Sequence, residues 1–224
     1  MNYAFWKRAF DICGAALLLA ATLLLWAIIA CLLLVTQGRP VLFRHRRVGL
    51  NGVPFLMLKF RTMRDGPPPR MPDRPVAKAP ADPRVTPIGQ VLRRFALDEL
   101  PQVLNVLRGE MSLVGPRPLP EEDLAQPGWL LQVSEEERAR RLAWAGRRQT
   151  VPPGVTGLWQ ITRNDEADFE NWIVSDLAYV ERRSLALDAF IVLYTPWAIL
   201  RGRDRRSRPQ SKQKAETTES GPPT

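Results

Sequence analysis

The sequence predicts an α+β fold that is predominantly α, with an N-terminal membrane helix, a small β-hairpin and a helical domain carrying amphipathic helices at the membrane interface. Three observations predict this fold. Residues 12–35 form an uncharged apolar run, an Asn51-Gly52 pair separates two strand-like segments, and residues 88–108 and 168–180 repeat apolar side chains at helical spacing.

The apolar run "ICGAALLLAATLLLWAIIACLLLV" extends from Ile12 to Val35 without a charge. At about 1.5 Å per residue, a helix of this length reaches roughly 36 Å, which is enough to cross the hydrocarbon core of a bilayer. A cleaved signal peptide has a shorter apolar region, and a core helix of a soluble domain has a polar side. The sequence therefore predicts a membrane-inserted segment over residues 1–37.

Basic residues flank this run on both sides. Lys7 and Arg8 precede it, and four arginines follow between Arg39 and Arg47. The more basic side is expected to be cytoplasmic, which places the bulk of the chain inside the cell. Cations at both ends also fit a segment that enters the membrane and returns to the same face, bending near Gly14 or Thr22 because no proline interrupts it. Both topologies remain open from the residues alone.

The composition limits the possible functions. The chain has 224 residues, 45% apolar content and a net charge of +9, which suggests one domain with a real core and a polyanionic partner. Cys13 and Cys31 both lie in the apolar run, so no disulfide framework is available. The single His45 excludes a histidine-rich zinc site and argues against a Ser–His triad.

Residues 41–62 are expected to form the hairpin, with Asn51-Gly52 as its turn. Alternation predicts that Leu56, Leu58 and Phe60 face the core and that Lys59 and Arg61 share the other face. Two cations on one face could bind a single anion, or they could be ordinary solvated charges on a half-buried strand.

Residues 64–87 contain eight prolines, which exclude a helix or a central strand and predict a mobile loop. In residues 88–108, Pro101 suits the first turn of a new helix and Gly109 suits its C-terminal cap. The chain is therefore expected to break near Asp98-Glu99, which places both acids at the amino end of that helix. Acids are common at this position as simple helix caps.

The later segments complete the expected domain. Residues 134–148 suit a surface helix, residues 152–164 a turn-rich loop, and residues 168–180 an amphipathic helix. Residues 187–200 are apolar and broken at Pro196, and their composition suits a helix in the lipid headgroup region. We expect three units: a membrane segment over 1–37, a catalytic domain over 38–201, and a disordered tail over 202–224.

A carboxylate is already ionised at neutral pH, so Asp98 could act as a nucleophile without a general base. Attack on a phosphorus atom requires relief of charge repulsion, which nearby cations and a Mg²⁺ ion held by Glu99 would supply. The candidate cations are Lys59, Arg61, Arg93 and Arg117. Phosphoryl transfer at a membrane surface is thus a coherent interpretation, although one acid pair alone is a weak signal.

The chain resembles the bacterial sugar transferases, which are monotopic phosphoglycosyl transferases, from Trp6 to about Arg201. The resemblance is carried by six segments: "KRAFD" (7–11), "GRPVLFRHRRVGLNGVPF" (38–55), "KFRTM" (59–63), "RVTPIGQVLRRFALDELPQVLNVLRGEMSLVGPRP" (84–118), "PGVTGLWQITRN" (153–164) and "DLAYVERRSLALD" (176–188). The block over 84–118 is the most specific, because few unrelated proteins would share its motifs in this order.

The resemblance implies transfer of a sugar phosphate from a nucleotide diphosphate sugar, by default a uridine one, to a polyprenyl phosphate such as undecaprenyl phosphate. Asp98 matches the nucleophile of the covalent intermediate, and Glu99 matches the partner acid associated with Mg²⁺. Lys59, Arg93 and Arg117 match cationic positions around the diphosphate. The loop with Trp159, Gln160, Arg163 and Asn164 would contact the nucleotide or the sugar.

By the same resemblance, the membrane segment is a re-entrant helix–break–helix in the bacterial inner membrane, with the catalytic domain on the cytoplasmic face. The implied role is the first membrane step in the assembly of a surface glycan, such as exopolysaccharide or lipopolysaccharide. The sequence departs from the family pattern at three places. Leu23-Leu24 replace a Ser-Pro pair, Pro152 replaces an arginine, and Thr162-Arg163-Asn164 is a shortened motif.

Two alternatives come from other functional classes. A non-catalytic membrane adaptor would use the basic surface to bind anionic lipid, and its function would not depend on Asp98. A nucleic-acid binder would explain the net charge, but the chain has no recognition helix with clustered base-reading side chains, so no nucleic acid is expected as a partner. An apolar surface that pairs with a second copy would make a homodimer, which the sequence leaves open.

Overall fold

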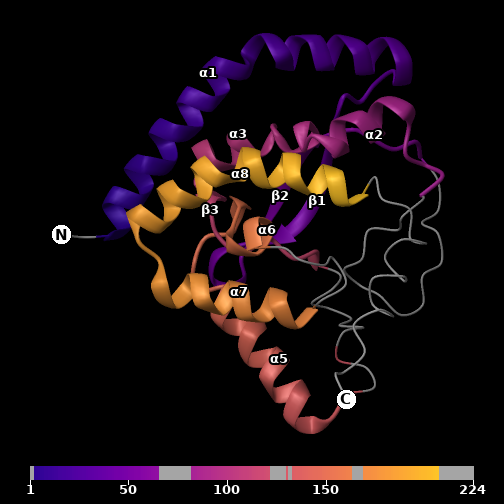
Figure 1. The fold of residues 1–224 in the computed structure, drawn as a ribbon. Coiled ribbons are helices and arrows are strands. Elements are labelled where there is room, and N and C mark those ends of the chain that lie inside the picture. The colour runs from indigo at the N-terminus through magenta and orange to yellow at the C-terminus, as the bar shows by residue number, and fades with distance from the viewer. Residues whose placement is uncertain (1–2, 66–81, 122–129, 131–132, 163–168, 207–224) are drawn as a thin grey trace, which may run out of the picture.

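The computed structural model describes residues 3–65, 82–121, 130, 133–162 and 169–206, and helices predominate as predicted (Figure 1). The elements follow in this order: α1 (Tyr3–Gln37), β1 (Leu42–Val48), η1 (Leu50–Gly52), β2 (Pro54–Phe60), α2 (Pro87–Arg94), η2 (Leu97–Glu99), α3 (Gln102–Arg108), β3 (Ser112–Val114), α5 (Glu135–Arg148), β4 (Gly154–Thr156), α6 (Leu158–Thr162), α7 (Phe169–Arg182) and α8 (Leu185–Arg206).

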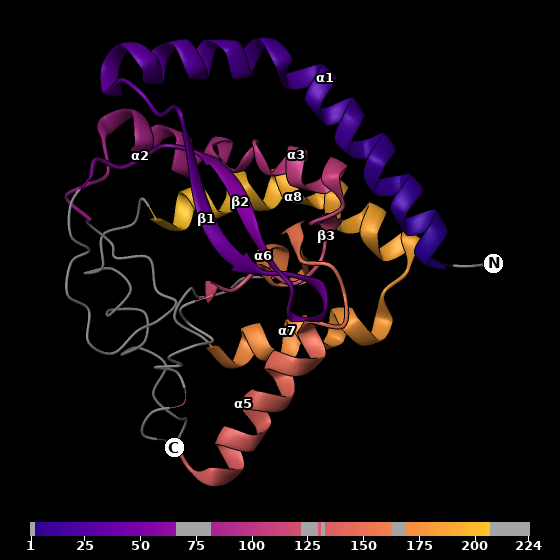
Figure 2. The ribbon, with the colours of Figure 1, turned by 180° about the vertical axis from the view of Figure 1, so that it is seen from behind.

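Helix α1 lies across the top of the molecule, starting beside α8 and ending beside α2 (Figures 1 and 2). At its start, Arg8 donates hydrogen bonds to the carbonyls of Val106 and Leu107, at 2.6 and 2.8 Å, at the C-terminal end of α3. At its end, Arg61 donates to the carbonyls of Gln37 and Gly38. Both ends of the apolar helix are therefore fixed to the same domain.

Helix α1 is continuous from Tyr3 to Gln37, whereas the family resemblance implied a break. It changes direction once along its length, as both views show (Figures 1 and 2). The hydroxyl of Thr22 donates to the carbonyl of Leu18 at 2.6 Å, a contact that often bends helices. Of the helices described, α1 is long and apolar enough to cross a membrane, and most of its most apolar stretch is uncovered by the rest of the protein.

Strands β1 and β2 form the predicted antiparallel hairpin, with Phe43 opposite Lys59. Asn51 and Gly52 both have positive φ, as the turn requires. The predicted faces are only partly right. Leu56 is 46% exposed, while Phe55 and Met57 are buried in the main core. Both faces of β2 are covered beyond Leu56, since Met57 packs in a cluster with residues of α1 and α3, and Phe60 in a cluster with residues of α1 and α2.

The segment predicted as a mobile loop over 64–87 is ordered at both ends. The amide of Arg64 donates to the carbonyl of Arg84 at 2.8 Å, and Met63 pairs with Val85 in an isolated bridge. The hydroxyl of Thr86 then accepts from the amide of Gly89 and caps α2. Residues 66–81 of this predicted loop lie outside the described residues.

Between α2 and α3 the chain breaks where the sequence predicted. Ala96 adopts a left-handed conformation with a φ of 55°, and η2 follows it directly. Pro101 is the N-cap of α3, and Gly109 ends α3 with a φ of 86°. Asp98 and Glu99 therefore lie in a short 3-10 turn just ahead of α3.

The predicted loop over 152–164 contains two elements instead. Strand β4 pairs in parallel with β3, with Ser112 opposite Gly154, and α6 follows directly. Close backbone approach explains the glycines here. A Cβ on Gly154 would lie 2.1 Å from the amide nitrogen of Gly115, and a Cβ on Gly157 would lie 2.3 Å from the carbonyl oxygen of Gly115. Arg163 and Asn164 lie outside the described residues.

Helices α5 and α7 pack together at the opposite end of the molecule from α1 (Figure 1). Their contact buries Trp144, Trp172 and Ile173, which confirms the amphipathic face predicted for 168–180. The predicted break at Pro196 is wrong, because α8 continues through it to Arg206, past the expected start of the disordered tail at Gly202. The rest of that tail, 207–224, lies outside the described residues.

Candidate active site

One carboxylate and two cations from three separate elements meet at the predicted site. Glu99 Oε1 lies 2.7 Å from Lys59 Nζ and 3.0 Å from Arg117 Nη2. Lys59 comes from β2, Glu99 from η2, and Arg117 from the loop after β3. The side chains of all three are at least three-quarters buried, so water screens these charges only weakly. The structure thus brings together three of the predicted site residues.

Asp98 is buried, with 7% of its surface exposed, and adjoins Glu99 in the same turn. Its carboxylate lies within electrostatic reach of Lys59 and Arg117. Ala96, the residue directly before η2, has an uncommon positive φ for a residue with a side chain, which costs roughly 1 kcal/mol. The fold tolerates this strain at the point where it turns both acids toward the cations.

Burial alters the acid–base properties of the cations. Desolvation lowers the pKa of the Lys59 ammonium, and the nearby Arg117 charge lowers it further, while Glu99 opposes both. The charge of Glu99 raises the pKa of Arg117 above its usual value. Arg117 is therefore a permanent positive charge at this site, and the charge of Lys59 depends on Glu99.

The other two predicted cations make different contacts. Arg93 donates from Nε to the hydroxyl of Thr62 at 2.9 Å, which fixes it on α2 beside the end of β2. Arg61, which could have shared an anion with Lys59 or been an ordinary solvated charge, donates to the carbonyls at the end of α1. The last carbonyls of a helix have no partner within the helix, and the guanidinium of Arg61 supplies hydrogen-bond donors for them at the end of α1.

Asn105 holds β2 against α3, a role that the sequence reasoning missed. Its Oδ1 accepts from the amide of Leu58 at 3.0 Å, and its Nδ2 donates to the carbonyl of Leu56 at 2.8 Å. Nδ2 also donates to Glu110 at 2.7 Å. These contacts fix the strand that carries Lys59 relative to the helix that follows Glu99. An asparagine at a helical position on the apolar face was the available signal.

A second missed feature is a buried polar network at the start of α1. Lys7 lies 3.0 Å from Asp11 and 3.2 Å from Asp188, and both acids are almost fully buried. Asp11 also accepts from Ser112 and Leu113 of β3, at 3.0 Å each. The charged "KRAFD" motif before the apolar run is thus an attachment point between α1, β3 and α8.

The aromatic residue predicted for the nucleotide or sugar loop lies in the core cluster between α5 and α7. Trp159 is tilted against Trp172, with ring centroids 5.3 Å apart, and packs with that cluster. Gln160 lies on α6, and both polar atoms of its amide are buried with no hydrogen-bond partner among the described residues. A Cβ on Gly157 would lie 2.9 Å from Gln160 Oε1, so the amide lies against Gly157, whose backbone in turn approaches Gly115.

The donors at the site fit a magnesium ion that is shared with a substrate. Among the described residues, no group of three or more His, Cys, Asp or Glu side chains could form a complete protein metal site. Mg²⁺ usually binds through one or two carboxylates together with substrate phosphates, and keeps several waters. Asp98 and Glu99 supply such a pair of carboxylates.

A membrane-type helix fixed at both ends to a domain with a buried acid–cation cluster defines a membrane-associated protein with a site for an anionic substrate. Residues 2–202 match the model of the bacterial sugar transferase family, and the chain belongs to that family. It is accordingly an enzyme of the phosphoglycosyl transferase type.

Three relatives illustrate the match. The exopolysaccharide production protein ExoY of Sinorhizobium fredii is 38% identical, covering 84% of this chain and 83% of its own. The uncharacterized sugar transferase EpsL of Bacillus subtilis is 36% identical, covering 87% of each chain. The UDP-glucose:undecaprenyl-phosphate glucose-1-phosphate transferase of Caulobacter vibrioides is 40% identical, covering 87% of this chain and 69% of its own.

Proposed function

We propose that the protein transfers a sugar 1-phosphate from a uridine diphosphate sugar to a polyprenyl phosphate and releases uridine monophosphate, as the first membrane step of surface glycan assembly. Relatives named as undecaprenyl-phosphate sugar transferases support both substrates. The observation that carries the proposal is the convergence of Lys59 and Arg117 on Glu99, directly beside the buried Asp98.

In the first step, a carboxylate oxygen of Asp98 attacks the phosphorus atom that bears the sugar. A bond forms between this oxygen and phosphorus, and the bond from phosphorus to the bridging oxygen of the diphosphate breaks. Uridine monophosphate leaves with the bonding electrons, and an acyl phosphate sugar remains on Asp98. Lys59 and Arg117 offset the charge repulsion between the attacking carboxylate and the phosphate oxygens.

In the second step, an oxygen of the polyprenyl phosphate attacks the same phosphorus atom. The new diphosphate bond forms as the bond to Asp98 breaks, which returns the aspartate as a carboxylate. No proton needs to be removed from either nucleophile, because both are already anions at neutral pH. This fits a site without a histidine, since His45 lies on the hairpin beside Phe43, with ring centroids 5.8 Å apart.

Glu99, together with Asp98, would hold Mg²⁺ at the diphosphate. When bound, the ion would neutralise charge on the leaving group. Within the protein, Glu99 keeps Lys59 and Arg117 in fixed positions and helps to keep Lys59 protonated.

The attachment of both ends of α1 to one domain supports a re-entrant topology. A straight span would leave its two ends on opposite sides of a bilayer core of about 30 Å. Arg8 and Arg61 instead fix the two ends to the same domain. We therefore infer that α1 dips into the membrane and returns, with the catalytic domain on the cytoplasmic face of the bacterial inner membrane. The exposed apolar side chains Phe190, Leu193 and Trp197 of α8 suit contact with the same interface.

The test uses purified protein in nanodiscs with polyprenyl phosphate, Mg²⁺ and a panel of nucleotide diphosphate sugars, scored for release of the nucleoside monophosphate. Asp98→Asn should abolish release, and the exposed Asp65→Asn should not. With the nucleotide sugar alone, mass spectrometry should find a sugar-phosphate adduct on the peptide that contains Asp98. No release by the unsubstituted protein with any sugar of the panel would favour the adaptor hypothesis. Release unchanged by Asp98→Asn, or an adduct on another residue, would exclude Asp98 as the nucleophile.

A further inference from the structure

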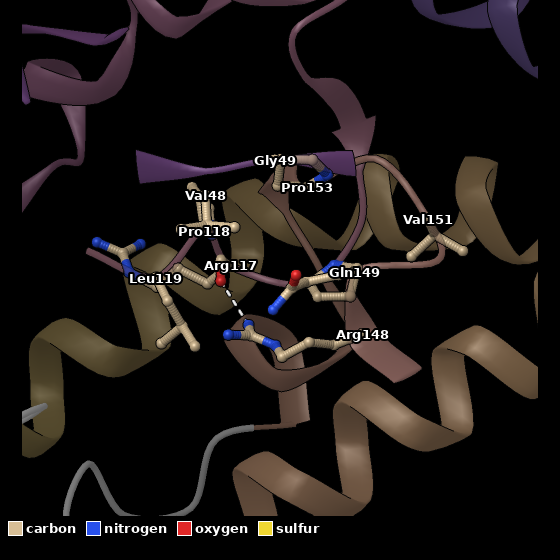
Figure 3. Close-up of a pocket in the computed structure, with 10 residues that line it drawn as sticks. Val48, Gly49, Arg117, Pro118, Leu119, Arg148, Gln149, Val151 and Pro153 are labelled. Carbon is tan, nitrogen blue, oxygen red and sulfur yellow. Dashed lines mark hydrogen bonds between the residues drawn. The ribbon is translucent and has the colours of Figure 1, made fainter. Parts of the chain in front are cut away.

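The loop that carries Arg117 is held by its carbonyl groups. Four consecutive carbonyls, from Pro116 to Leu119, each accept a hydrogen bond from a different donor. The amide of Gly154 donates to Pro116 at 2.9 Å, Arg47 to Pro118 at 3.1 Å, and the amide of Val48 to Leu119 at 3.0 Å; Arg148 donates to Arg117 itself. Figure 3 shows Arg148 beneath this loop, with its guanidinium directed at the Arg117 carbonyl.

Arg148 is a buried charge with a precise set of partners. It is 4% exposed, at the end of α5, and its Nη2 lies 3.0 Å from Asp176 of α7. Its guanidinium lies over the rings of Trp144 and Trp172, at 4.6 and 5.2 Å from their centroids. A charge is costly to bury unless its partners compensate, so a buried arginine on an otherwise solvated helix requires an explanation.

One nitrogen of Arg148 links the two halves of this arrangement. Nη2 contacts both Asp176 and the carbonyl of Arg117, and it has two hydrogens with which to do so. The side chain of Arg117 extends from the other side of the same residue to Glu99. Proline rings at 116 and 118 fix their own φ angles, so the hydrogen bond from Arg148 acts on a residue between two rigid neighbours and orients its carbonyl.

We propose that Arg148 is a positioning residue for the transfer reaction: anchored on Asp176 and the two tryptophans, it fixes the Arg117 backbone so that the Arg117 guanidinium stays on Glu99. The inference rests on the proposed function, because the effect of Arg148 is exerted through a cation of the proposed site. The inference assigns this role to Arg148 and not to its neighbour Arg147, which pairs with Glu181 on the surface.

A double-mutant cycle tests this role. Arg148→Lys keeps the charge but loses the planar, stacked fork that bridges Asp176 and the carbonyl. With Arg117 present, it should lower kcat/KM by about 10- to 100-fold, the scale expected for a small misplacement of a catalytic group. In the Arg117→Gln background the same substitution should change kcat/KM by less than about twofold, since the positioned group is already gone.

Thermal unfolding of the four proteins separates positioning from general stability. Arg148→Lys should lower the melting temperature by a similar amount in both backgrounds, although its effect on kcat/KM differs between them. Arg147→Lys serves as the matched control and should leave both quantities unchanged. If Arg148→Lys does not fold, Asp176→Asn replaces it in the same cycle, because it keeps Arg148 but weakens its anchor.

Three results would overturn the inference: an equal loss of kcat/KM in both backgrounds, no loss with Arg117 present, or an equal loss from Arg147→Lys. Absence of turnover by the unsubstituted protein would overturn the proposed function, and this inference with it. Normal turnover with additive losses would overturn the positioning role alone.

Discussion

Lys59 Nζ and Glu99 Oε1 lie 2.7 Å apart although 40 residues separate them in the sequence. The pair forms because Asn105 fixes β2 against α3, and because Ala96 turns the chain just before the acids. Burial strengthens the attraction between Lys59 and Glu99, because little water screens the two charges. Burial also lowers the pKa of Lys59, so that Lys59 stays protonated only with the support of Glu99.

The first prediction concerns the alkaline limit of activity. Because burial lowers the pKa of Lys59, its charge is lost at a lower pH than for an ordinary lysine, and kcat/KM should fall as the pH rises through that value. Lys59→Arg retains a permanent charge, so its alkaline fall should move to higher pH even if its maximal rate is reduced. The measurement is a pH profile of kcat/KM for both proteins. Identical alkaline limbs would show that Lys59 does not titrate in the reaction.

The second prediction concerns the close approach of the two loops around Arg117. A Cβ on Gly154 would lie 2.1 Å from the Gly115 amide nitrogen and 2.3 Å from the Thr156 carbonyl oxygen, and backbone atoms cannot move aside cheaply. Gly154→Ala should therefore lower both the melting temperature and the activity, the latter by at least about tenfold.

Gly146→Ala is the matched control for that prediction. Outside its own helix, a Cβ there meets no atom of the described residues within 4 Å, and the residue lies within α5. Alanine should stabilise this helix by about 0.5–1 kcal/mol and leave the activity unchanged. Equal tolerance of both substitutions would contradict the close backbone contact.

The third prediction concerns Asn105. Asn105→Leu keeps the approximate volume but leaves the Leu58 amide and the Leu56 carbonyl without their partner. An unsatisfied buried group costs about 1–3 kcal/mol, so a marked fall in melting temperature is expected, with reduced activity because β2 carries Lys59. Asn51→Gly is a suitable control, since Asn51 occupies a left-handed turn that glycine also adopts. A stable and active Asn105→Leu protein would disprove this role.

The fourth prediction concerns the topology of α1. In a chain with Cys13 and Cys31 replaced by serine, single cysteines are introduced in place of Phe5 and Arg39, which lie near opposite ends of α1 and are exposed. An impermeant maleimide should label both positions in inside-out membrane vesicles and neither in right-side-out vesicles. Labelling of one position in each preparation would mean that α1 spans the membrane.

Strong local signals were sufficient for several elements. The Asn51-Gly52 pair placed the hairpin, the uncharged run placed α1, and Pro101 and Gly109 gave the limits of α3. These features depend on backbone preferences or on composition, which the sequence displays directly. Charge chemistry and the family motifs likewise grouped Lys59 and Arg117 with the acids in one predicted site, although they did not predict that both cations pair with Glu99.

The features that could not be predicted from the sequence depend on contacts between residues far apart in the chain. Strands β3 and β4 are three residues each and about 40 positions apart, so neither has a local pattern. Arg148 lies in a segment whose charges predict a solvated helix, and its burial depends on Asp176, two tryptophans and the carbonyl of Arg117. The contact of Arg61 with the end of α1 could not be predicted, because the need of α1 for a C-terminal cap is visible only once both are folded.

The way α1 is built into the domain limits how a detergent-free form of the enzyme could be engineered. Ala15, Ile29 and Leu33 fill two of the core clusters, and Asp11 accepts hydrogen bonds from β3. Deleting the segment would remove buried side chains from both clusters and would leave Ser112 and Leu113 of β3 without their hydrogen bonds to Asp11. Recoding only its outward residues, such as Leu17, Leu24 and Val35, would leave those attachments in place.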